Sequence, residues 1–570
     1  MHLRFITTCF GCCQTRLSFL NIQRPLLEAV QVASTGSRQL CLSSVERKPF
    51  FVTTPIYYVN AAPHMGHLYS SVIADATARY QRLKGADVMF STGTDEHGLK
   101  IQQAATQTKT SPDLFVSKVS QSFKTMFDGY HIGYTDYIRT TEERHHRTVT
   151  HVWNELVRRG HIYKGDYEGW YCVSDEAFLG ADDVVDRTDK HGNTIKVSVE
   201  SGHQVTWMKE DNYMFSLSRF KDQLHAWLDK DVIQPQMFDS NVRRWVDDLR
   251  DLSVSRSKSR LTWGIPVPGD NTQTIYVWLD ALLNYLTVTG YPDTAVFPWP
   301  PDVQVIGKDI LKFHAVYWPA FLTALGLELP KKIFCHSHWM VDGVKMSKSL
   351  GNVVDPMALK DKYSAEVLRY YLLREGVPQN DGNFNEKVAI EYVNSDVVNT
   401  MGNLLSRCTG TSLNPDQIFP RRNTDVYQSR FNTAERETFE NLEMLTETVD
   451  NYYKELNFYK GIESVMSYLR WANSVVTVHE PWKLAKSQEE GDKAYVKTVI
   501  HIALETLRVG GILLQPVIPD IAARLLNRLG IPAELRTLEH AKKPYLNSPE
   551  HFPLGPNEGA LLRRLNVPTK

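Results

Sequence analysis

The sequence predicts an α/β protein in which a parallel-sheet domain is interrupted by an insertion and followed by a C-terminal bundle of helices. Three observations predict this: a strand–helix–strand pattern over residues 50–98, a break in the pattern at about 165–260, and helical apolar spacing from Asn385 onward. At 570 residues the chain is too long for one hydrophobic core. We therefore expect a leader, four domain segments and a tail, with bounds at 1–45, 46–164, 165–260, 261–384, 385–545 and 546–570.

The leader differs in composition from the rest of the chain. Its 45 residues include four arginines and a single acid, Glu28, and are rich in Ser and Thr. An acid-poor leader of this kind is typical of a mitochondrial transit peptide, which predicts a location in the mitochondrial matrix. A disordered tail is the alternative. A secretory signal is disfavoured, because no compact apolar run with a small-residue cleavage site follows a basic start.

The overall composition is that of soluble globular domains, with 42% hydrophobic and 23% charged residues. No run of about 18 apolar residues occurs, so we expect no membrane span. The formal net charge of −1 means that any nucleic-acid surface must be a local patch. The seven cysteines form no disulfide-like framework, which favours a reducing compartment.

The parallel sheet is predicted to begin with an apolar strand at residues 50–53, followed by a loop at 54–63. A helix is expected over 66–84, where apolar residues recur at helical spacing and Gly85 supplies the stop. Residues 88–90 form the next strand. A strand, a crossover helix and a second strand within this length require a parallel pair.

The later segments complete this architecture. Residues 165–260 contain short strands, turns and charge, and the α/β pattern resumes near Thr274 and continues to about Tyr371. Two apolar stripes at helical spacing then predict packed helices. One stripe comprises Leu442, Leu445, Val449, Tyr452 and Leu456, and the other Val496, Val499, Ala503 and Leu507.

A polar cluster, Pro-His-Met-Gly-His at residues 63–67, falls where the first loop enters the first helix, beyond the carboxyl end of a parallel strand. Gly66 permits close backbone approach, and a helix N-terminus favours anions. His64 and His67 could therefore hydrogen-bond a triphosphate as its charge shifts in the transition state. Helix capping without a catalytic role is the alternative interpretation.

A second phosphate-binding candidate is Lys-Met-Ser-Lys-Ser at 345–349, which follows an Asp-Gly turn. Lys345 and Lys348, with interleaved hydroxyls and Gly351 nearby, make a mobile positive clamp. Such a clamp suits adenylyl transfer, in which catalysis is mostly positioning and charge neutralisation. Taken alone, this short run would more often be a solvated basic turn. No Walker-type or GxGxxG pattern competes with the two motifs for a nucleotide.

Together, in this order and about 280 residues apart, the two motifs resemble the paired signatures of class I aminoacyl-tRNA synthetases. Over residues 50–540 the chain is most similar to the methionyl branch of that family. The resemblance implies a Rossmann-like catalytic domain split by a connective insertion, and a C-terminal anticodon-binding bundle. It further implies that methionine and ATP with Mg²⁺ form methionyl-adenylate and pyrophosphate, and that the methionyl group passes to the 3′ end of tRNA(Met).

The resemblance also assigns site residues by position. The catalytic residues are expected to be His64, His67, Lys345 and Lys348, to which the ATP site adds Gly66, Gly307, Lys308 and Asp309. The methionine pocket is expected to comprise Ile56, Tyr58, Asp95, Trp278, Tyr285 and His314. In the family, the carboxylate at the position of Asp95 pairs with the substrate ammonium. Aromatic faces suit the flexible, polarisable methionine side chain, although Trp278 and Tyr285 in isolation would be interpreted as core aromatics.

A second recognition surface is implied in the helical region. Asn403 and Arg407 are four residues apart and so share a helix face, and Trp482 follows a proline. The resemblance implies that these three residues contact the anticodon, because unstacked bases are held by aromatic rings and read by Arg and Asn. A helix surface with a buried Trp482 is the alternative.

The connective insertion departs from part of the family, in which paired cysteines hold zinc. Here Cys172 has Asp175 where a second cysteine would stand, and His191 and His203 are too distant to complete a good tetrahedral set. We therefore predict no structural zinc. Because no dimerisation segment is appended, we expect a monomer whose partners are tRNA(Met), methionine and ATP.

Other functions remain open. A synthetase of the same class for leucine, isoleucine or valine is disfavoured, because no large editing insertion is present. One for cysteine would need thiolate ligands for zinc near the pocket segments. A nucleotidylyltransferase shares the HxGH turn but does not need the helical bundle. A non-catalytic RNA-binding descendant is disfavoured because both histidines and both lysines are intact.

Overall fold

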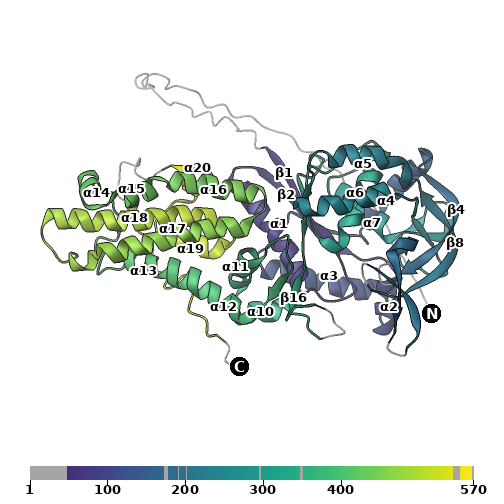
Figure 1. Ribbon diagram of the computed structural model, residues 1–570, viewed down its shortest axis with the longest axis horizontal. Helices are drawn as coiled ribbons and strands as arrows, with labels where there is room; N and C mark the ends of the chain where they lie inside the picture. Colours follow the sequence, from purple (N-terminus) through teal and green to yellow (C-terminus); the bar gives the residue numbers. More distant parts are fainter. Residues whose placement is uncertain are drawn as a thin grey trace, which may run out of the picture. The chain divides into compact units, whose positions relative to one another are not determined.

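The computed structural model describes residues 48–172, 177–189, 192–199, 202–293, 297–346, 351–543 and 552–567 (Figure 1). The predicted transit peptide lies outside these ranges, as does part of the predicted tail. Asp175, His191 and Lys348 also lie outside them. Among the described residues, no helix has the length and apolar character needed to cross a membrane.

A six-stranded sheet in the order β3-β2-β1-β14-β15-β9 carries the first part of the fold. Every neighbouring pair in it is parallel, which confirms the predicted α/β class. Its members are β1 (Pro49–Tyr58), β2 (Asp87–Asp95), β3 (Asp136–Arg139), β9 (Ile233–Gln234), β14 (Val303–Gly307) and β15 (Ile333–His336).

The helix α1 (Met65–Leu83) connects β1 to β2 and follows the predicted bounds closely. Gly85 has a φ of +87°, as its predicted role as the helix stop requires. Both strands are longer than predicted. Residues 54–58, expected to be a loop, continue β1, because a register shift between Thr53 and Ile56 accommodates the intervening proline. As a result, β1 and β2 end at the same edge of the sheet, at Tyr58 and Asp95.

The insertion is built on the long antiparallel pair β4 (Ile162–Cys172) and β8 (Val205–Phe215). The short strands β5 (Ala177–Leu179) and β10 (Leu252–Ser253) flank this pair, and β6 (Val184–Thr188) and β7 (Thr194–Ser198) form a separate ribbon. Between the helices α5 (Lys221–Leu228) and α6 (Asp239–Asp247), the strand β9 returns to pair with β15. Residues 233–234, expected within the insertion, therefore form the edge of the parallel sheet.

The C-terminal region is helical, as predicted (Figure 1). Its principal helices are α12 (Glu386–Val393), α13 (Asn403–Thr409), α16 (Leu442–Lys454), α17 (Phe458–His479), α18 (Glu490–Leu514) and α19 (Pro519–Arg528). All four residues of the predicted stripe in α18 are buried. In α16 the tyrosine assignment was wrong by one position: Tyr453 rather than Tyr452 is buried, because its ring packs edge-on against Tyr80 of α1 at 5.6 Å.

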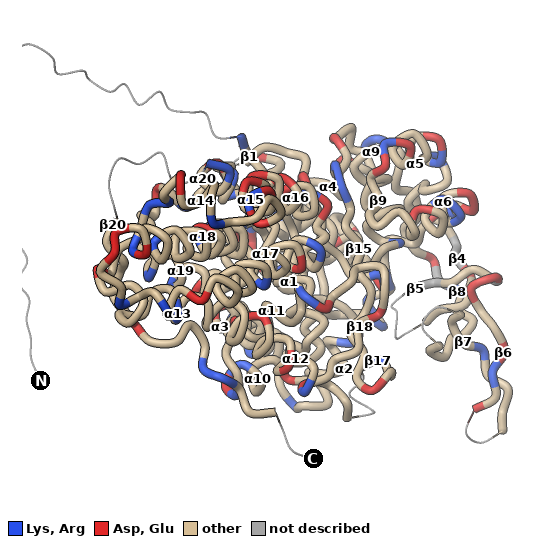
Figure 2. Tube along the Cα trace, turned by 60° about the vertical axis from the view of Figure 1, so that its left-hand side comes forward, with Lys and Arg blue, Asp and Glu red and all other residues tan. Residues whose placement is uncertain are grey.

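Helix α1 lies between the parallel sheet and the helical region (Figures 1 and 2). Near its end, the hydroxyl of Tyr80 donates to Oδ1 of Asp450 on α16 at 2.5 Å. Near its middle, Asp75 pairs at 2.6 Å with Arg369 of α11 (Ala365–Glu375), and both side chains are fully buried. One continuous apolar cluster runs from the sheet through α1 into the bundle. Acidic and basic residues are interspersed over both regions (Figure 2).

Candidate active site

A cavity of about 950 Å³ lies at the carboxyl ends of β1, β2 and β14, the edge at which parallel sheets bind ligands. It brings together most of the predicted catalytic, ATP and methionine residues. Those that line it are Ile56, Tyr58, His64, Gly66, His67, Asp95, Trp278, Tyr285, Gly307, Asp309, His314 and Lys345. Lys308 is not part of this lining, because its ammonium pairs with Asp381 at 2.6 Å.

The two histidines of the first motif cap α1. Nδ1 of His64 accepts from the N–H of Gly66, and Nδ1 of His67 accepts from the N–H of His64, both at 3.1 Å. The rings stack with centroids 3.7 Å apart. Because these caps use Nδ1 as the acceptor, the proton of each neutral imidazole resides on Nε2. His64 and His67 can therefore cap the helix and still line the cavity. The caps fix the orientation of both rings at a helix N-terminus, a position that favours phosphate binding.

An aromatic wall forms one side of the cavity. Trp278, on α7 (Val277–Leu282), stacks on Phe313 with ring centroids 3.6 Å apart and an interplanar angle of 9°. His314 lies edge-on to the same indole at 6.4 Å. Sequence reasoning missed Phe313. The available signal was its position directly before His314, a residue already expected in the methionine pocket. The stacked pair offers a flat, polarisable surface suited to a thioether.

His314 is buried and held at both ring nitrogens. Nδ1 donates to the carbonyl of Ile310 at 2.9 Å, and Nε2 accepts from the hydroxyl of Tyr285 at 2.8 Å. Burial lowers the pKa of His314 to about 4, although its bond to the Ile310 carbonyl opposes the shift. The imidazole is therefore neutral at physiological pH and adds no positive charge to this wall.

The described lysine of the second motif meets a carboxylate across the cavity. Lys345 Nζ, on β17 (Val344–Lys345), lies 3.2 Å from Oδ1 of Asp309, and Nε2 of His338 lies 2.8 Å from Oδ2. Burial raises the pKa of Asp309, but His338 and Lys345 outweigh it and lower the pKa to about 2. Asp309 is thus an anion that holds the lysine at the cavity.

A buried carboxylate behind the aromatic wall had no predicted role. Asp280 of α7 contacts Nδ1 of His97 at 2.6 Å and Nε2 of His145 at 2.8 Å. Burial raises the pKa of Asp280, but the two histidines outweigh it and hold the pKa below its usual range. The sequence signal was an acid within the apolar run Tyr276–Ala281. The contact ties the helix that carries Trp278 to the segment that follows Asp95.

In the helical region the structure brings two of the three predicted anticodon residues together. The guanidinium of Arg407 lies over the ring of Trp482, 5.4 Å from its centroid. Trp482 is 46% exposed, which excludes the alternative of a buried plug. Asn403 is exposed one turn before Arg407 on α13.

Within the described residues, no group of three or more His, Cys, Asp or Glu side chains is arranged to hold a metal ion. Cys172 is buried, and His203 lies at the cavity. Because Asp175 and His191 lie outside the described ranges, the expected lack of zinc stays a prediction.

Comparison with known proteins gives a consistent result. The family model of class I tRNA synthetases (M) matches residues 50–409. The mitochondrial methionine–tRNA ligase of Xenopus laevis is 46% identical over 540 residues, covering 93% of this chain and 96% of that protein. The human counterpart is 46% identical over 554 residues, covering 94% and 93%. A solved structure of Mycobacterium tuberculosis methionyl-tRNA synthetase in complex with methionyl-adenylate matches with a TM-score of 0.85 at 36% identity, covering 91% of this chain and all of that one. The chain therefore belongs to the methionine–tRNA ligase family of class I tRNA synthetases.

Proposed function

We propose that the chain is a mitochondrial methionine–tRNA ligase that works in two steps at the cavity described above. In the first step, the methionine carboxylate attacks the α-phosphorus of ATP, and the bond to pyrophosphate breaks. In the second, a ribose hydroxyl of the terminal adenosine of tRNA(Met) attacks the acyl carbon, and AMP leaves. The observation that carries the proposal is that one cavity gathers the N-terminus of α1, a carboxylate, an aromatic wall and a motif lysine.

The residues at the helix N-terminus would act on the phosphates. His64 and His67 carry their protons on Nε2 and would donate to phosphate oxygens as charge develops during adenylate formation. Gly66 would let the backbone approach the nucleotide, and Gly307 at the end of β14 would form part of the same site. Mg²⁺ would enter with ATP as part of the substrate.

The amino-acid end of the cavity suits methionine. Asp95 would pair with the substrate ammonium, and Ile56 and Tyr58 would border it from the neighbouring strand. The side chain would lie against Trp278, Tyr285 and His314. A thioether interacts well with aromatic faces, and a neutral His314 does not repel the ammonium group.

The motif lysines would neutralise the leaving group. Lys345 pairs with Asp309 at 3.2 Å, and the β- and γ-phosphates would compete with that carboxylate for its ammonium group. Lys348, outside the described residues, and Lys308 are proposed to contribute to the same clamp. The proposed anticodon contacts are Asn403, Arg407 and Trp482, in the bundle over 385–545.

We infer a mitochondrial matrix location from the composition of the leader and the names of the relatives. The proposed domain bounds are those expected from the sequence, apart from β9, which joins the sheet. The protein is further proposed to be a monomer without structural zinc. Sedimentation velocity and zinc analysis of the purified protein test these two proposals separately.

Pyrophosphate exchange tests the central proposal. Protein lacking the leader is assayed for ATP–pyrophosphate exchange with each standard amino acid in turn, and methionine should stimulate exchange best. Stimulation that is stronger with another amino acid would contradict the assignment. Lys345→Ala and Lys348→Ala should each slow adenylate formation about 100-fold or more while methionine affinity changes little. The matched control is Lys331→Ala, which removes a surface lysine paired with Asp302.

A further inference from the structure

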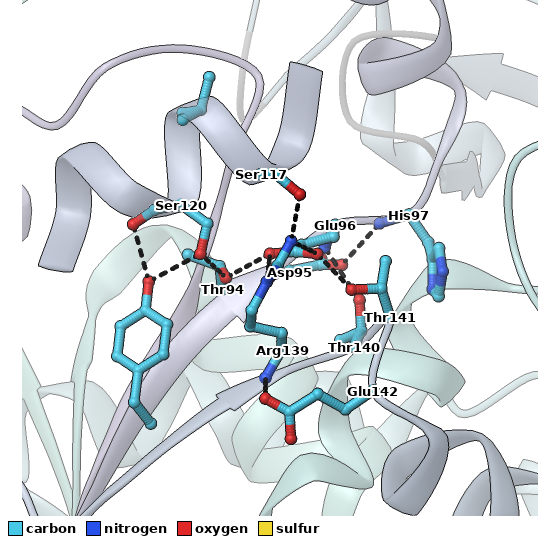
Figure 3. A network of polar contacts seen from close by, with 12 residues as sticks. Thr94, Asp95, Glu96, His97, Ser117, Ser120, Arg139, Thr140, Thr141 and Glu142 are labelled. Carbon is cyan, nitrogen blue, oxygen red and sulfur yellow. Dashed lines mark hydrogen bonds and ion pairs between the residues drawn. The ribbon is translucent and has the colours of Figure 1, made fainter. Parts of the chain in front are cut away.

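The residue that follows Asp95 is a second carboxylate, Glu96, whose side chain is 0% exposed. Both of its oxygens are occupied (Figure 3). Oε1 accepts from Nε of Arg139 and from the hydroxyl of Thr94, each at 2.7 Å. Oε2 accepts from Nη2 of Arg139 at 3.0 Å and from the hydroxyl of Thr141 at 2.6 Å. A buried carboxylate with four donors is a rigid anchor, because moving it would leave several polar groups unpaired.

Hydrogen bonds of Glu96 and its neighbours connect the end of β2 to three neighbouring segments (Figure 3). Thr94 exchanges a hydrogen bond of 2.8 Å with Ser120 on α3 (Pro112–Gly129). The backbone N–H of Glu96 donates to Oγ1 of Thr140 at 3.0 Å, and Arg139 extends from β3. The residues before and after Asp95 are thus each tied to neighbouring structure.

Asp95 itself lies at the cavity. Side chains alternate along β2, so Thr94 lies on the side opposite Asp95, and the bond from the Thr94 hydroxyl places the Glu96 carboxylate on the Thr94 side as well. Their bonds to α3, β3 and the loop after β3 are consistent with this. The backbone N–H of His97 lies 3.5 Å from Oδ1 of Asp95, and the bonds of Thr94 and Glu96 fix the backbone on both sides of this carboxylate.

The network also offsets the negative charge of Glu96, which is adjacent to Asp95 in the sequence. The guanidinium of Arg139 offsets the charge of Glu96 through a bidentate ion pair. Because both oxygens of Glu96 already accept two donors, Glu96 cannot compete with Asp95 for a cationic group in the cavity. Of these two adjacent carboxylates, Asp95 is the one that lines the cavity.

We propose that Glu96, held by Arg139, is a positioning residue that fixes the Asp95 carboxylate for the α-ammonium group of the amino acid. By fixing Asp95, Glu96 makes the cavity prefer an α-amino acid to a carboxylic acid that has the same side chain and no amine. This inference rests on the proposed function, since it assumes that methionine binds in the cavity.

The test compares methionine with 4-(methylthio)butanoate, which has the same side chain and carboxylate but no amine. Dissociation constants of both are measured by calorimetry for the wild type and Glu96→Gln, which keeps the shape and removes the charge. Methionine binding should weaken about tenfold or more, and analogue binding should change less than about twofold. Equal weakening of both compounds, or no change in either, would overturn the proposal.

Two milder variants keep the test informative if Glu96→Gln folds poorly. Thr141→Val removes one donor to Glu96, and Arg139→Lys keeps the positive charge but loses the bidentate contact. Both should lower the ratio of methionine to analogue affinity, by less than Glu96→Gln does. Glu505→Gln is the matched control: it breaks a buried Arg–Glu pair in α18, at 2.7 Å to Arg508, and should leave the ratio unchanged. Failure of the proposed function has a different signature, because the wild type would then show no methionine-dependent exchange.

Discussion

The hydroxyl of Tyr285 donates to Nε2 of His314 across 2.8 Å, and the other nitrogen of the same ring donates to the carbonyl of Ile310. Both side chains are buried at the cavity wall. The phenol therefore fixes the tautomer and the orientation of the imidazole without charging it.

Tyr285→Phe should weaken methionine binding selectively. The change removes the donor and leaves Nε2 of His314 buried without its partner, which costs about 1–3 kcal/mol, roughly 5–150-fold in affinity. The KM for methionine in pyrophosphate exchange should rise accordingly, and the KM for ATP should change less than about twofold. Tyr453→Phe, which removes a buried hydroxyl bonded to the Leu513 carbonyl, should alter neither. Parallel rises in both KM values would argue against a methionine-specific role.

Stability should fall at acidic pH because of His336, which is buried at the cavity with Nε2 2.7 Å from the hydroxyl of Ser70. Burial lowers its pKa to about 4, against about 6.5 in an unfolded chain. Below pH 6.5 the unfolded state takes up a proton that the folded state does not. The stability contributed by neutral His336 is therefore complete above pH 6.5 and is lost as pH falls toward 4.

Urea unfolding of the wild type and His336→Gln at pH 7.5 and pH 5.0 measures this effect. The wild type should lose roughly 2 kcal/mol more than the variant between the two pH values, because the proton-uptake difference at pH 5.0 spans about 1.5 pH units. Ionisations common to both proteins cancel in the comparison. Identical losses would show that His336 does not titrate as a buried neutral group.

Trp482→Ala should affect tRNA charging but not amino-acid activation. If Trp482 stacks on an anticodon base, its loss should cost about 1–3 kcal/mol, seen as a KM for tRNA raised roughly 5–150-fold. Pyrophosphate exchange in the absence of tRNA should remain unchanged, because the ring lies in the bundle and not at the cavity. Met444→Ala, which truncates another exposed apolar side chain on the bundle, is the control. An unaltered tRNA KM in Trp482→Ala would remove this residue from the proposed surface.

Asp75→Asn should destabilise the whole protein. The change leaves the Arg369 guanidinium buried without its counter-ion, which costs about 3–5 kcal/mol. Urea denaturation monitored by circular dichroism gives the free energy of unfolding. Asp186→Asn, which breaks an exposed pair with Lys196, should change it by less than about 1 kcal/mol. A loss in Asp75→Asn as small as in this control would contradict the assigned importance of the buried pair.

Local features were predictable from the sequence, since spacing alone encodes them. The buried face of α18 and the glycine stop after α1 follow from helical periodicity and backbone preference. The length of β1 was not predictable, because a proline usually ends a strand and only a register shift against β2 lets the pairing continue beyond it. Tyr453 replaced Tyr452 in the core for a similar reason, since its partner Tyr80 is far away in the sequence.

The candidate site was predictable as a list of residues but not as an arrangement. The family resemblance, confirmed by the comparisons, carried the residue list. Contacts such as Phe313 on Trp278, or Lys345 with Asp309, join segments about 35 residues apart, so no local pattern contains them. Three of the four donors to Glu96 likewise come from a separate strand and the loop after it. Only the folded chain reveals which polar groups satisfy one another.

Helix α1 has a consequence for how the molecule unfolds. Its 19 residues span about 28 Å, from the histidine-capped end at the cavity to Tyr80 on the bundle, with the Asp75–Arg369 pair between them. The apolar side chains along it pack into the same continuous core as the sheet and the bundle. A fragment ending before Asn385 would therefore leave a face of α1 in water, and loss of the bundle would loosen the element that presents His64 and His67. The substrate cavity is a small part of the protein, but the cooperative folding unit that maintains its geometry is much larger.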